Sequence, residues 1–222
     1  MKNLSLAEQY TLCILNDKEN RSVLYSNEYA VCILASSLWE LISYKAIKQD
    51  ENKKLVVNGE FNNTKNYLKY IYDDIALKKS RDVNEVVEDY VFHVSGNNLK
   101  NIINSLVDDL IERGYIKIEK QDGLFKERTV YLSNENVIND IMKKIREDVL
   151  EEQNINTETM ILVSMLFWTK SYKEYFSKYE TKQLKVKLEK IKETNEYLFI
   201  KKILDDIQSI LLSIVISSKS MG

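Results

Sequence analysis

The stretch from residue 27 to residue 43 constrains the fold most, because on a helix it is apolar on nearly every side. Seven consecutive apolar residues, Tyr29 to Ala35, are followed by Leu38, Trp39, Leu41 and Ile42. A helix without a polar face has to be surrounded by other elements, as the central helix of a bundle is. The chain also lacks proline and has only 5 glycines among 222 residues, which favours helices over long loops. We therefore predict a mainly α fold, a helical bundle around a central helix at about residues 27–43.

A second pattern, from Ser95 to Ser133, predicts a helix followed by a β-hairpin. Apolar residues repeat at helical spacing along one face: Leu99, Ile102, Ile103, Leu106, Val107, Leu110 and Ile111. Gly114 follows, and glycine often occupies the left-handed position at which a helix ends. Beyond it the apolar period changes to two, and Gln121–Gly123 indicates a tight turn. We expect a winged-helix-like helix that leads into a protruding β-hairpin at about residues 115–132.

Two kinds of protein use such a helix and hairpin. In a winged-helix protein the helix enters the DNA major groove, whereas in a membrane-binding protein the hairpin tip can offer apolar residues to lipid. Here the tip is Leu124 and Phe125. The helix carries two basic residues against three acidic ones, Lys100 and Arg113 against Asp108, Asp109 and Glu112. Because affinity for a phosphate backbone depends on clustered Lys and Arg, this charge disfavours nucleic acid as the partner.

Shorter patterns predict the elements that surround these two. Ser5 and Glu8 have the spacing of a capping box, which predicts a helix from about Leu6 to Asn16. Residues 22–25 are expected as a short extended piece, and residues 46–57 as a small surface hairpin.

The residue types that carry chemistry form no recognisable catalytic or metal-binding set. His93 is the only histidine, so any metal site or catalytic dyad that uses a histidine would have to include it, and we expect a structural or solvent-exposed role. Cys13 and Cys32 lack a CxxC spacing and lie in apolar helical patterns, so we expect buried thiols in a reducing compartment. The chain has no Gly-rich phosphate loop, no G-x-S-x-G elbow and no H-E-x-x-H motif. We predict no catalytic residues, no metal, no cofactor and no enzymatic activity.

Overall charge provides no general attraction to polyanions, because 32 basic and 34 acidic residues leave a net charge of −2. An anion site must therefore be local. One basic run is a candidate, but acidic residues are interspersed and a solvated helix face is expected; its lysines are Lys182, Lys185, Lys187, Lys190 and Lys192. The N-terminus lacks a signal-peptide pattern, and charges interrupt the longest apolar stretch, residues 197–216. We expect a cytoplasmic protein that is soluble or peripheral on the cytoplasmic membrane face.

These elements, in this order, resemble the Golgi phosphoprotein 3 family, whose members are largely helical and bind phosphatidylinositol 4-phosphate at membranes. The opening LSLAEQYTLCILND, Leu4 to Asp17, is similar to that family's first helix, and the similarity continues to Ile47. A second match, LVDDLIERGYIKIEKQ at Leu106 to Gln121, is similar to the helix that leads into that family's hairpin. The resemblance implies one helical domain over residues 1–222. Within it we expect a subdomain break near residues 148–156, because this stretch is polar and acidic and has no periodicity. The content of Lys, Asn and Ile is typical of an AT-rich genome and favours a divergent bacterial member.

The resemblance also implies a lipid headgroup site. In phosphoinositide-binding members the headgroup is held by a Trp before the central helix, an Arg within it and two Arg on the helix before the hairpin. In register, Tyr25 occupies the Trp position and Lys100 one Arg position, whereas the other two Arg positions fall on Leu34 and Ile103. Each charge-assisted contact to phosphate contributes roughly 1.5 to 3 kcal/mol, so losing two contacts would weaken recognition of this headgroup by orders of magnitude.

We therefore predict a non-enzymatic peripheral membrane protein or adaptor that binds an anionic, phosphoinositide-like lipid. Tyr25, Lys100 and the tip pair Leu124 and Phe125 are expected to face the lipid, and Arg21 and Lys126 are candidates for electrostatic compensation. One alternative is a protein–protein scaffold that forms a homo-oligomer through the hairpin, as some relatives in the family do. The other alternative is a winged-helix nucleic-acid-binding protein.

Overall fold

The computed structural model describes residues 4–18, 20–61, 65–78, 81–92, 97–122, 128–151 and 156–191, together with 198 and 201. In this part of the chain the elements are α1 (Leu6–Lys18), η1 (Arg21–Tyr25), α2 (Asn27–Ser43), β1 (Ile47–Gln49), β2 (Lys54–Val57), α3 (Asn66–Leu77), β3 (Arg81–Asp82), α4 (Val83–Phe92), α5 (Asn97–Glu112), β4 (Ile116–Gln121), β5 (Arg128–Ser133), α6 (Glu135–Ile145), η2 (Arg146–Glu151), α7 (Thr157–Trp168), η3 (Ser171–Glu174) and α8 (Lys178–Ile191). The elements η1 and η3 are 3₁₀ helices, and η2 is a π-helix. The predicted mainly α fold is confirmed.

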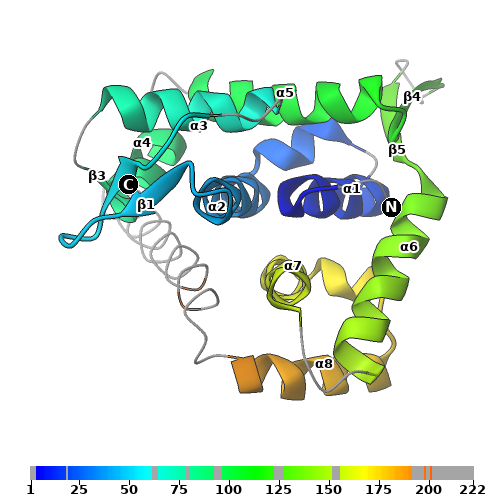
Figure 1. Cartoon of the computed structure of the whole chain (residues 1–222). Helices are drawn as coiled ribbons and strands as arrows, with labels where there is room; N and C mark the ends of the chain where they lie inside the picture. The colour runs from blue at the N-terminus through cyan, green and yellow to red at the C-terminus, as the bar shows by residue number, and fades with distance from the viewer. Residues whose placement is uncertain are drawn as a thin grey trace, which may run out of the picture.

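The central helix is α2, with the bounds that its apolar sequence predicted. Every side chain from Ala30 to Leu38 is buried, and α2 packs against α1, α3, α4 and α5. Figure 1 shows it end-on beneath α3 and α5. Its two buried serines bond to the helix backbone: Ser36 Oγ donates to the Cys32 carbonyl at 2.8 Å, and Ser37 Oγ to the Ile33 carbonyl at 2.7 Å. The hydroxyls of both buried serines are therefore paired within the helix.

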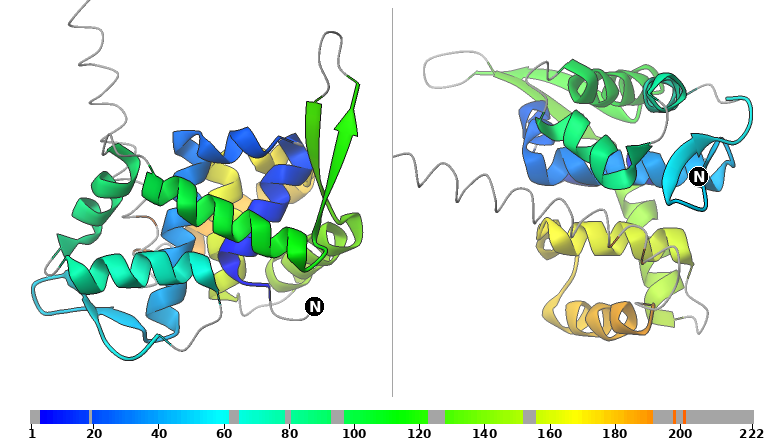
Figure 2. Two further views of the ribbon diagram at one scale, coloured as in Figure 1. Left: turned by 90° about the horizontal axis from the view of Figure 1, so that it is seen from above. Right: turned by 90° about the vertical axis from the view of Figure 1, so that its left-hand side faces the viewer.

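The helices stack in layers. In Figure 1, α3 and α5 form the upper layer, α1 and α2 lie beneath them, and α7 and then α8 follow below. Packing contacts agree, because α3 packs on α5, α1 packs on both α2 and α7, and α7 packs on α8. One helix, α6, runs down the side of the molecule and links the upper elements to the lower ones. As Figure 2 also shows, α5 and α8 lie on opposite faces of the protein.

The predicted hairpin is confirmed as β4 and β5, which pair antiparallel from Ile116↔Ser133 to Gln121↔Arg128. Gly114 ends the preceding helix with a φ of 75°, a backbone conformation that glycine adopts without strain. At the base, Ser133 Oγ donates a hydrogen bond to the Leu12 carbonyl of α1 at 2.8 Å. The two strands extend beyond the helical body (Figure 2). The tip residues Leu124 and Phe125 lie outside the described residues.

The hairpin expected at residues 46–57 is also confirmed, as β1 paired with β2. A third strand that was not predicted, β3, pairs with β2. It has only two residues, too few to show a period of two in the sequence. Arg81 of β3 fixes it to the neighbouring helices, because its guanidinium forms ion pairs with Asp74 of α3 and Asp89 of α4.

Two lysines occupy helix ends at which glycine is usual. Lys45 follows α2 with a φ of 58°, and Lys170 follows α7 with a φ of 61°. Each closes its helix by donating its N–H to a carbonyl three residues back, at 2.9 Å for Lys45 and 3.1 Å for Lys170. A side chain in this left-handed region costs about 1 to 2 kcal/mol relative to the right-handed region.

Candidate functional site

The connection between α1 and α2 forms the 3₁₀ helix η1, which carries Arg21 and Tyr25 to α5. Asn20 caps it, because Asn20 Oδ1 accepts a hydrogen bond from the Ser22 N–H at 2.9 Å. Leu24 is fully buried and anchors the turn to the core. The extended piece predicted for residues 22–25 is therefore wrong, since the asparagine cap and the buried leucine favour a helical turn.

Asn104, on the outward face of α5, is the residue at which these side chains meet. Its Oδ1 accepts hydrogen bonds from the Tyr25 hydroxyl and from Arg21 Nη2, the latter at 2.8 Å. Arg21 Nη1 lies 3.1 Å from Asp108 Oδ1, one turn further along the same helix. The guanidinium also lies 5.7 Å from the ring centroid of Tyr131 on β5. One arginine thus joins η1, α5 and the hairpin.

Lys100 lies one helical turn before Asn104, with its side chain exposed. Residues four apart on a helix are neighbours on one face, so Lys100 and the Tyr25 hydroxyl belong to the same surface. Leu34 and Ile103, in contrast, are fully buried and cannot contact a ligand. We call the surface formed by Arg21, Tyr25, Lys100, Asn104, Asp108 and Tyr131 the η1–α5 surface.

Charge on this surface favours a single small anion. Arg21 and Lys100 are positive, and Asp108 opposes them. The Arg21 side chain is 19% exposed, whereas that of Asp108 is 58% exposed. An ion pair with so exposed a carboxylate contributes at most about 1 kcal/mol. A phosphate could therefore displace Asp108 and accept charge-assisted hydrogen bonds from the guanidinium.

Beside the η1–α5 surface, a hollow of about 310 Å³ opens between α3 and α5. Its lining is polar and includes Asn66, Tyr70, Asn101, Asn104, Ser105, Asp108, Asp109 and Glu112. Three of these residues, Asp108, Asp109 and Glu112, are acidic and repel anions, so the positive part of the surface is confined to Arg21 and Lys100.

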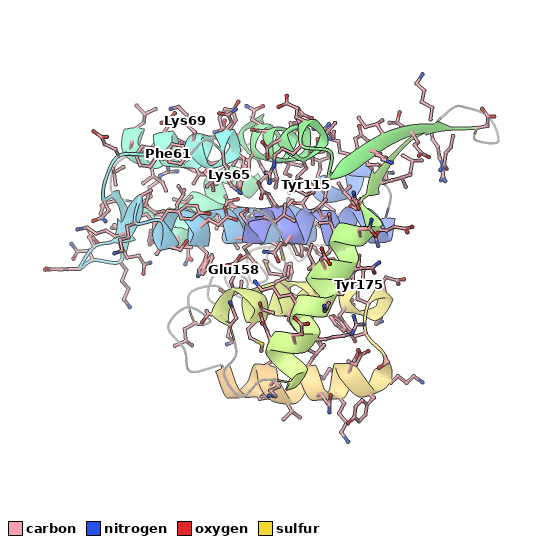
Figure 3. The ribbon with its side chains drawn as sticks, turned by 45° about the vertical axis from the view of Figure 1, so that its right-hand side comes forward. Phe61, Lys65, Lys69, Tyr115, Glu158 and Tyr175 are labelled. Carbon is pink, nitrogen blue, oxygen red and sulfur yellow. The ribbon has the colours of Figure 1, made fainter. Side chains whose placement is uncertain are left out.

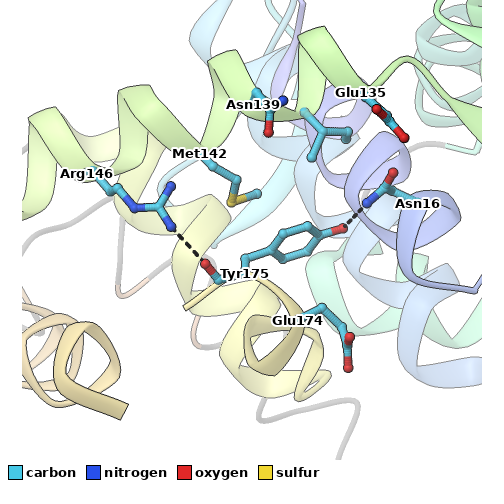
Figure 4. A pocket seen from close by; sticks show the side chains of 8 residues that line it. Asn16, Glu135, Asn139, Met142, Arg146, Glu174 and Tyr175 are labelled. Carbon is cyan, nitrogen blue, oxygen red and sulfur yellow. Dashed lines mark hydrogen bonds between the residues drawn. The ribbon is translucent and has the colours of Figure 1, made fainter. Parts of the chain in front are cut away.

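A second hollow, of about 350 Å³, lies between the end of α1, α6 and η3 (Figure 4). The Tyr175 hydroxyl donates to the Cys13 carbonyl at 2.6 Å and accepts a hydrogen bond from Asn16 Nδ2 at 3.4 Å. Arg146 donates from Nη2 to the Tyr175 carbonyl at 2.9 Å and from Nε to Glu180 at 2.7 Å. The Arg146 hydrogen bond lowers the pKa of Glu180 to about 2. These hydrogen bonds connect α1, η2 and α8 to Tyr175 at the end of η3. We therefore interpret the polar groups of this hollow as contacts that hold the fold together, not as a binding site.

A buried carboxylate, Glu8, ties the start of α1 to the upper layer. Its Oε2 accepts the Ser5 N–H at 2.7 Å, which confirms the predicted capping box. Its Oε1 lies 2.7 Å from Lys65 Nζ at the start of α3 and 2.7 Å from Arg113 Nη1 after α5. Lys65 lies between the layers of α3 and α1 (Figure 3). The Glu8 charge is fully buried but has two cationic partners.

A second buried carboxylate, Glu40 of α2, has neutral hydrogen-bond donors instead. Its Oε1 accepts the Ala7 N–H and its Oε2 accepts the Tyr67 hydroxyl, both at 2.8 Å. The Tyr67 hydroxyl is in turn 2.7 Å from Ser5 Oγ. Burial raises the pKa of Glu40 to about 7, because desolvation outweighs these hydrogen bonds and the charge of nearby Lys65. The pKa of Glu40 thus lies near neutral pH, and Glu40 lines neither of the two hollows described above.

The family model described as Golgi phosphoprotein 3 (GPP34) matches residues 6–208. This chain belongs to the Golgi phosphoprotein 3 family. The match spans every element from α1 to α8. No curated protein sequence matches the chain.

The resemblance to the Golgi phosphoprotein 3 family implied a headgroup site with one Trp and three Arg positions, and the structure shows where the residues at these positions lie in this chain. Tyr25 and Lys100, which the resemblance placed at the Trp position and one Arg position, both reach the η1–α5 surface. Leu34 and Ile103, at the other two Arg positions, belong to the core. Arg21 is outside the three Arg positions, yet it brings a guanidinium to the same surface from the adjacent turn.

Among the residues that the structure describes, no helix is long and apolar enough to cross a bilayer, and no group of His, Cys, Asp and Glu is arranged to hold a metal ion. Cys13 and Cys32 are buried, as predicted, and burial raises the pKa of both thiols, to about 12 for Cys32. His93 lies outside the described part of the chain.

Asn104, Asp108 and Tyr131 are the members of the η1–α5 surface that the sequence did not predict as site residues. Asn104 was visible only as one of several polar residues on the outward face of its helix. Its bond with Arg21 spans 83 residues of sequence and has no local pattern. The one sequence feature that could have indicated this part of the surface is Arg21, an arginine four residues before Tyr25.

Proposed function

We propose that this protein is a non-enzymatic peripheral membrane protein, and that its η1–α5 surface binds an anionic, phosphoinositide-like lipid. Membership of the Golgi phosphoprotein 3 family supports this proposal. The observation that carries it is the convergence of Arg21 and Tyr25 on Asn104, one turn from the exposed Lys100. The cytoplasmic membrane face and a single domain over residues 1–222 belong to the same proposal.

The position of the hairpin supports a combined electrostatic and apolar contact. The strands β4 and β5 project from the end of α5, so the hairpin and the η1–α5 surface can approach one bilayer (Figure 2). Burial of the tip pair Leu124 and Phe125 in the headgroup boundary would contribute about 3 to 6 kcal/mol. The headgroup would meet only one lysine and one arginine. We therefore expect the protein to bind anionic lipids in general, with little selectivity for phosphatidylinositol 4-phosphate over other anionic headgroups.

Vesicle flotation at physiological salt tests this proposal. We expect the protein to float with phosphatidylcholine vesicles that contain phosphatidylinositol 4-phosphate, and to stay behind with phosphatidylcholine alone. Lys100→Glu should lower the floated fraction several-fold, because it reverses an exposed charge at the headgroup. Leu124→Asp/Phe125→Asp should do the same by removing the apolar tip.

The matched control is Lys143→Glu, the same charge reversal at an exposed position on α6. It should leave flotation unchanged. Equal binding by Lys100→Glu and Lys143→Glu, or no binding of the unaltered protein, would remove the proposal.

A second candidate function, self-association through the hairpin, is favoured by the edges of its sheet. In the described part of the chain, β4 and β5 pair only with each other, and Ile118 on β4 is exposed. Open strand edges can pair with a second copy of the chain. Light scattering across a concentration series tests this, and a constant monomer mass would exclude it. Nucleic acid is not proposed, because the outward face of α5 ends in Asp108, Asp109 and Glu112.

A further inference from the structure

The outward face of α8 combines exposed apolar side chains with lysines. Leu184 and Leu188 are buried on the inner side, where α8 packs against α7. On the outer side, Tyr179 is 70% and Val186 is 54% exposed. These two residues are seven positions apart, which is two helical turns, so they lie on one face. A shallow hollow of about 350 Å³ between them is lined by Tyr179, Lys182, Gln183, Val186 and Lys187.

The charge around this apolar pair is strongly positive. From residue 178 to residue 191 the helix has five lysines and two glutamates. One of these glutamates, Glu180, is turned to Arg146 at 2.7 Å, so its charge is balanced within the fold. Lys182 is exposed on the outer side, and Lys185 is exposed on the flank of the helix. The expectation that this basic run is only a solvated face overlooked Tyr179 and Val186, whose exposure the sequence did not indicate.

We propose that the outward face of α8 is a second membrane-contact surface, which lies along an anionic bilayer. Tyr179 and Val186 enter the headgroup boundary, and the lysines lie over lipid phosphates. A bilayer fits better than a protein, because a specific protein interface buries about 800 Å² on each side, whereas this single convex helix offers only two exposed large apolar side chains. Amphipathic basic helices bind anionic lipid without shape complementarity.

The position of α8 determines whether both surfaces can contact the same membrane. It lies on the face of the molecule opposite α5 (Figures 1 and 2), so α8 and the η1–α5 surface cannot lie on the same flat bilayer. A protein with both surfaces bridges two anionic membranes. The bridging rests on the proposed function of the η1–α5 surface, whereas lipid binding by α8 does not.

The test uses the full chain and vesicles of phosphatidylcholine with phosphatidylserine at low salt, without phosphoinositide. Lys182→Glu/Lys185→Glu is compared with Lys48→Glu/Lys143→Glu, which makes the same change of charge at exposed positions of β1 and α6. Both pairs are introduced into the Lys100→Glu variant, so that the η1–α5 surface does not mask the effect. Circular dichroism confirms that each variant keeps its helix content.

Each lysine near an anionic surface contributes about a fivefold factor in partitioning, so the α8 pair should lower the partition coefficient by about thirtyfold or more. The control pair should change it less than about threefold. Tyr179→Ser/Val186→Ser should lower it several-fold further while leaving charge intact. Equal partitioning of the α8 pair and the control pair would overturn the inference. If Lys100→Glu alone has no effect in the phosphoinositide flotation assay, the proposed function fails while the α8 surface is still tested.

Vesicle clustering, followed by dynamic light scattering, tests the bridging directly. The unaltered protein should enlarge anionic vesicles into clusters, and Lys182→Glu/Lys185→Glu should bind vesicles through the η1–α5 surface without clustering them. Clustering that persists in this variant would contradict bridging through α8.

Discussion

Replacing Glu40 with glutamine should remove a large part of the pH dependence of stability. Glu40 is 1% exposed, and burial raises its pKa from 4.5 to about 7. The folded state therefore holds a proton that the unfolded chain releases between these two pH values. The Glu40 contribution is most favourable below pH 4.5 and falls as the pH rises through 7. At 1.36 kcal/mol per pKa unit, the free energy of unfolding decreases by about 3 kcal/mol across this window.

Glutamine can keep the local hydrogen bonds. Its side-chain oxygen can accept the Ala7 N–H, as Glu40 Oε1 does. Its amide can donate to the Tyr67 oxygen, after which the Tyr67 hydroxyl donates to Ser5 Oγ, 2.7 Å away. Glu40→Gln thus imitates the protonated acid, and we expect it to be more stable than the unaltered protein at pH 8 and similar at pH 5.

Urea unfolding followed by far-ultraviolet circular dichroism at pH 5 and pH 8 measures this difference. Relative to Glu40→Gln, the unaltered protein should lose about 2 to 3 kcal/mol between the two pH values, because a small part of the decrease has already occurred at pH 5. Glu88→Gln, an exposed carboxyl on α4, serves as the control and should change the pH dependence little. An identical pH dependence for Glu40→Gln and the unaltered protein would refute the argument. So would an unaltered protein that is more stable than Glu40→Gln at pH 8.

Three further substitutions test the packing. Arg81→Ala should lower the free energy of unfolding by about 1 to 3 kcal/mol in urea unfolding, because Asp74 and Asp89 lose their more buried partner and keep only the half-exposed Lys78; a loss below 0.5 kcal/mol would contradict this. Lys170→Gly should raise the melting temperature, with a gain of up to about 1 kcal/mol from relief of the left-handed backbone; a lower melting temperature would argue against this strain. Ser5→Ala should cost about 1 to 2 kcal/mol, since it removes the cap of α1 and a partner of Tyr67; an unchanged urea midpoint would show that Glu8 caps the helix alone.

Local periodicity was sufficient to predict the main elements. The central helix and the helix–hairpin unit follow from spacings within about 20 residues of sequence, and both are present with nearly the predicted bounds. The capping box of α1 was predictable for the same reason, because Ser5 and Glu8 are three residues apart. Family membership also came from the order of such local patterns, and the family match extends over residues 6–208.

The parts that depend on distant contacts could not be predicted in this way. The strand β3 is too short to have a period and exists because β2 is already in place. The helical form of η1 depends on one capping asparagine and one leucine inserted into the core. The meeting of Arg21 with Asn104 requires the fold itself, and so does the exposure of Tyr179 and Val186, which as apolar residues on a helix were indistinguishable from core residues.

A single labelled cysteine measures most directly whether the η1–α5 surface contacts lipid. Both native thiols, Cys13 and Cys32, are fully buried, so an exposed introduced cysteine can be labelled selectively. Ser22→Cys places an environment-sensitive fluorophore on η1, and Lys143→Cys places it on α6. On addition of phosphatidylinositol 4-phosphate vesicles at physiological salt, we predict a blue-shifted, brighter emission at position 22 and an unchanged spectrum at position 143. Vesicle binding without a spectral change at position 22, or with equal changes at both positions, would contradict the account.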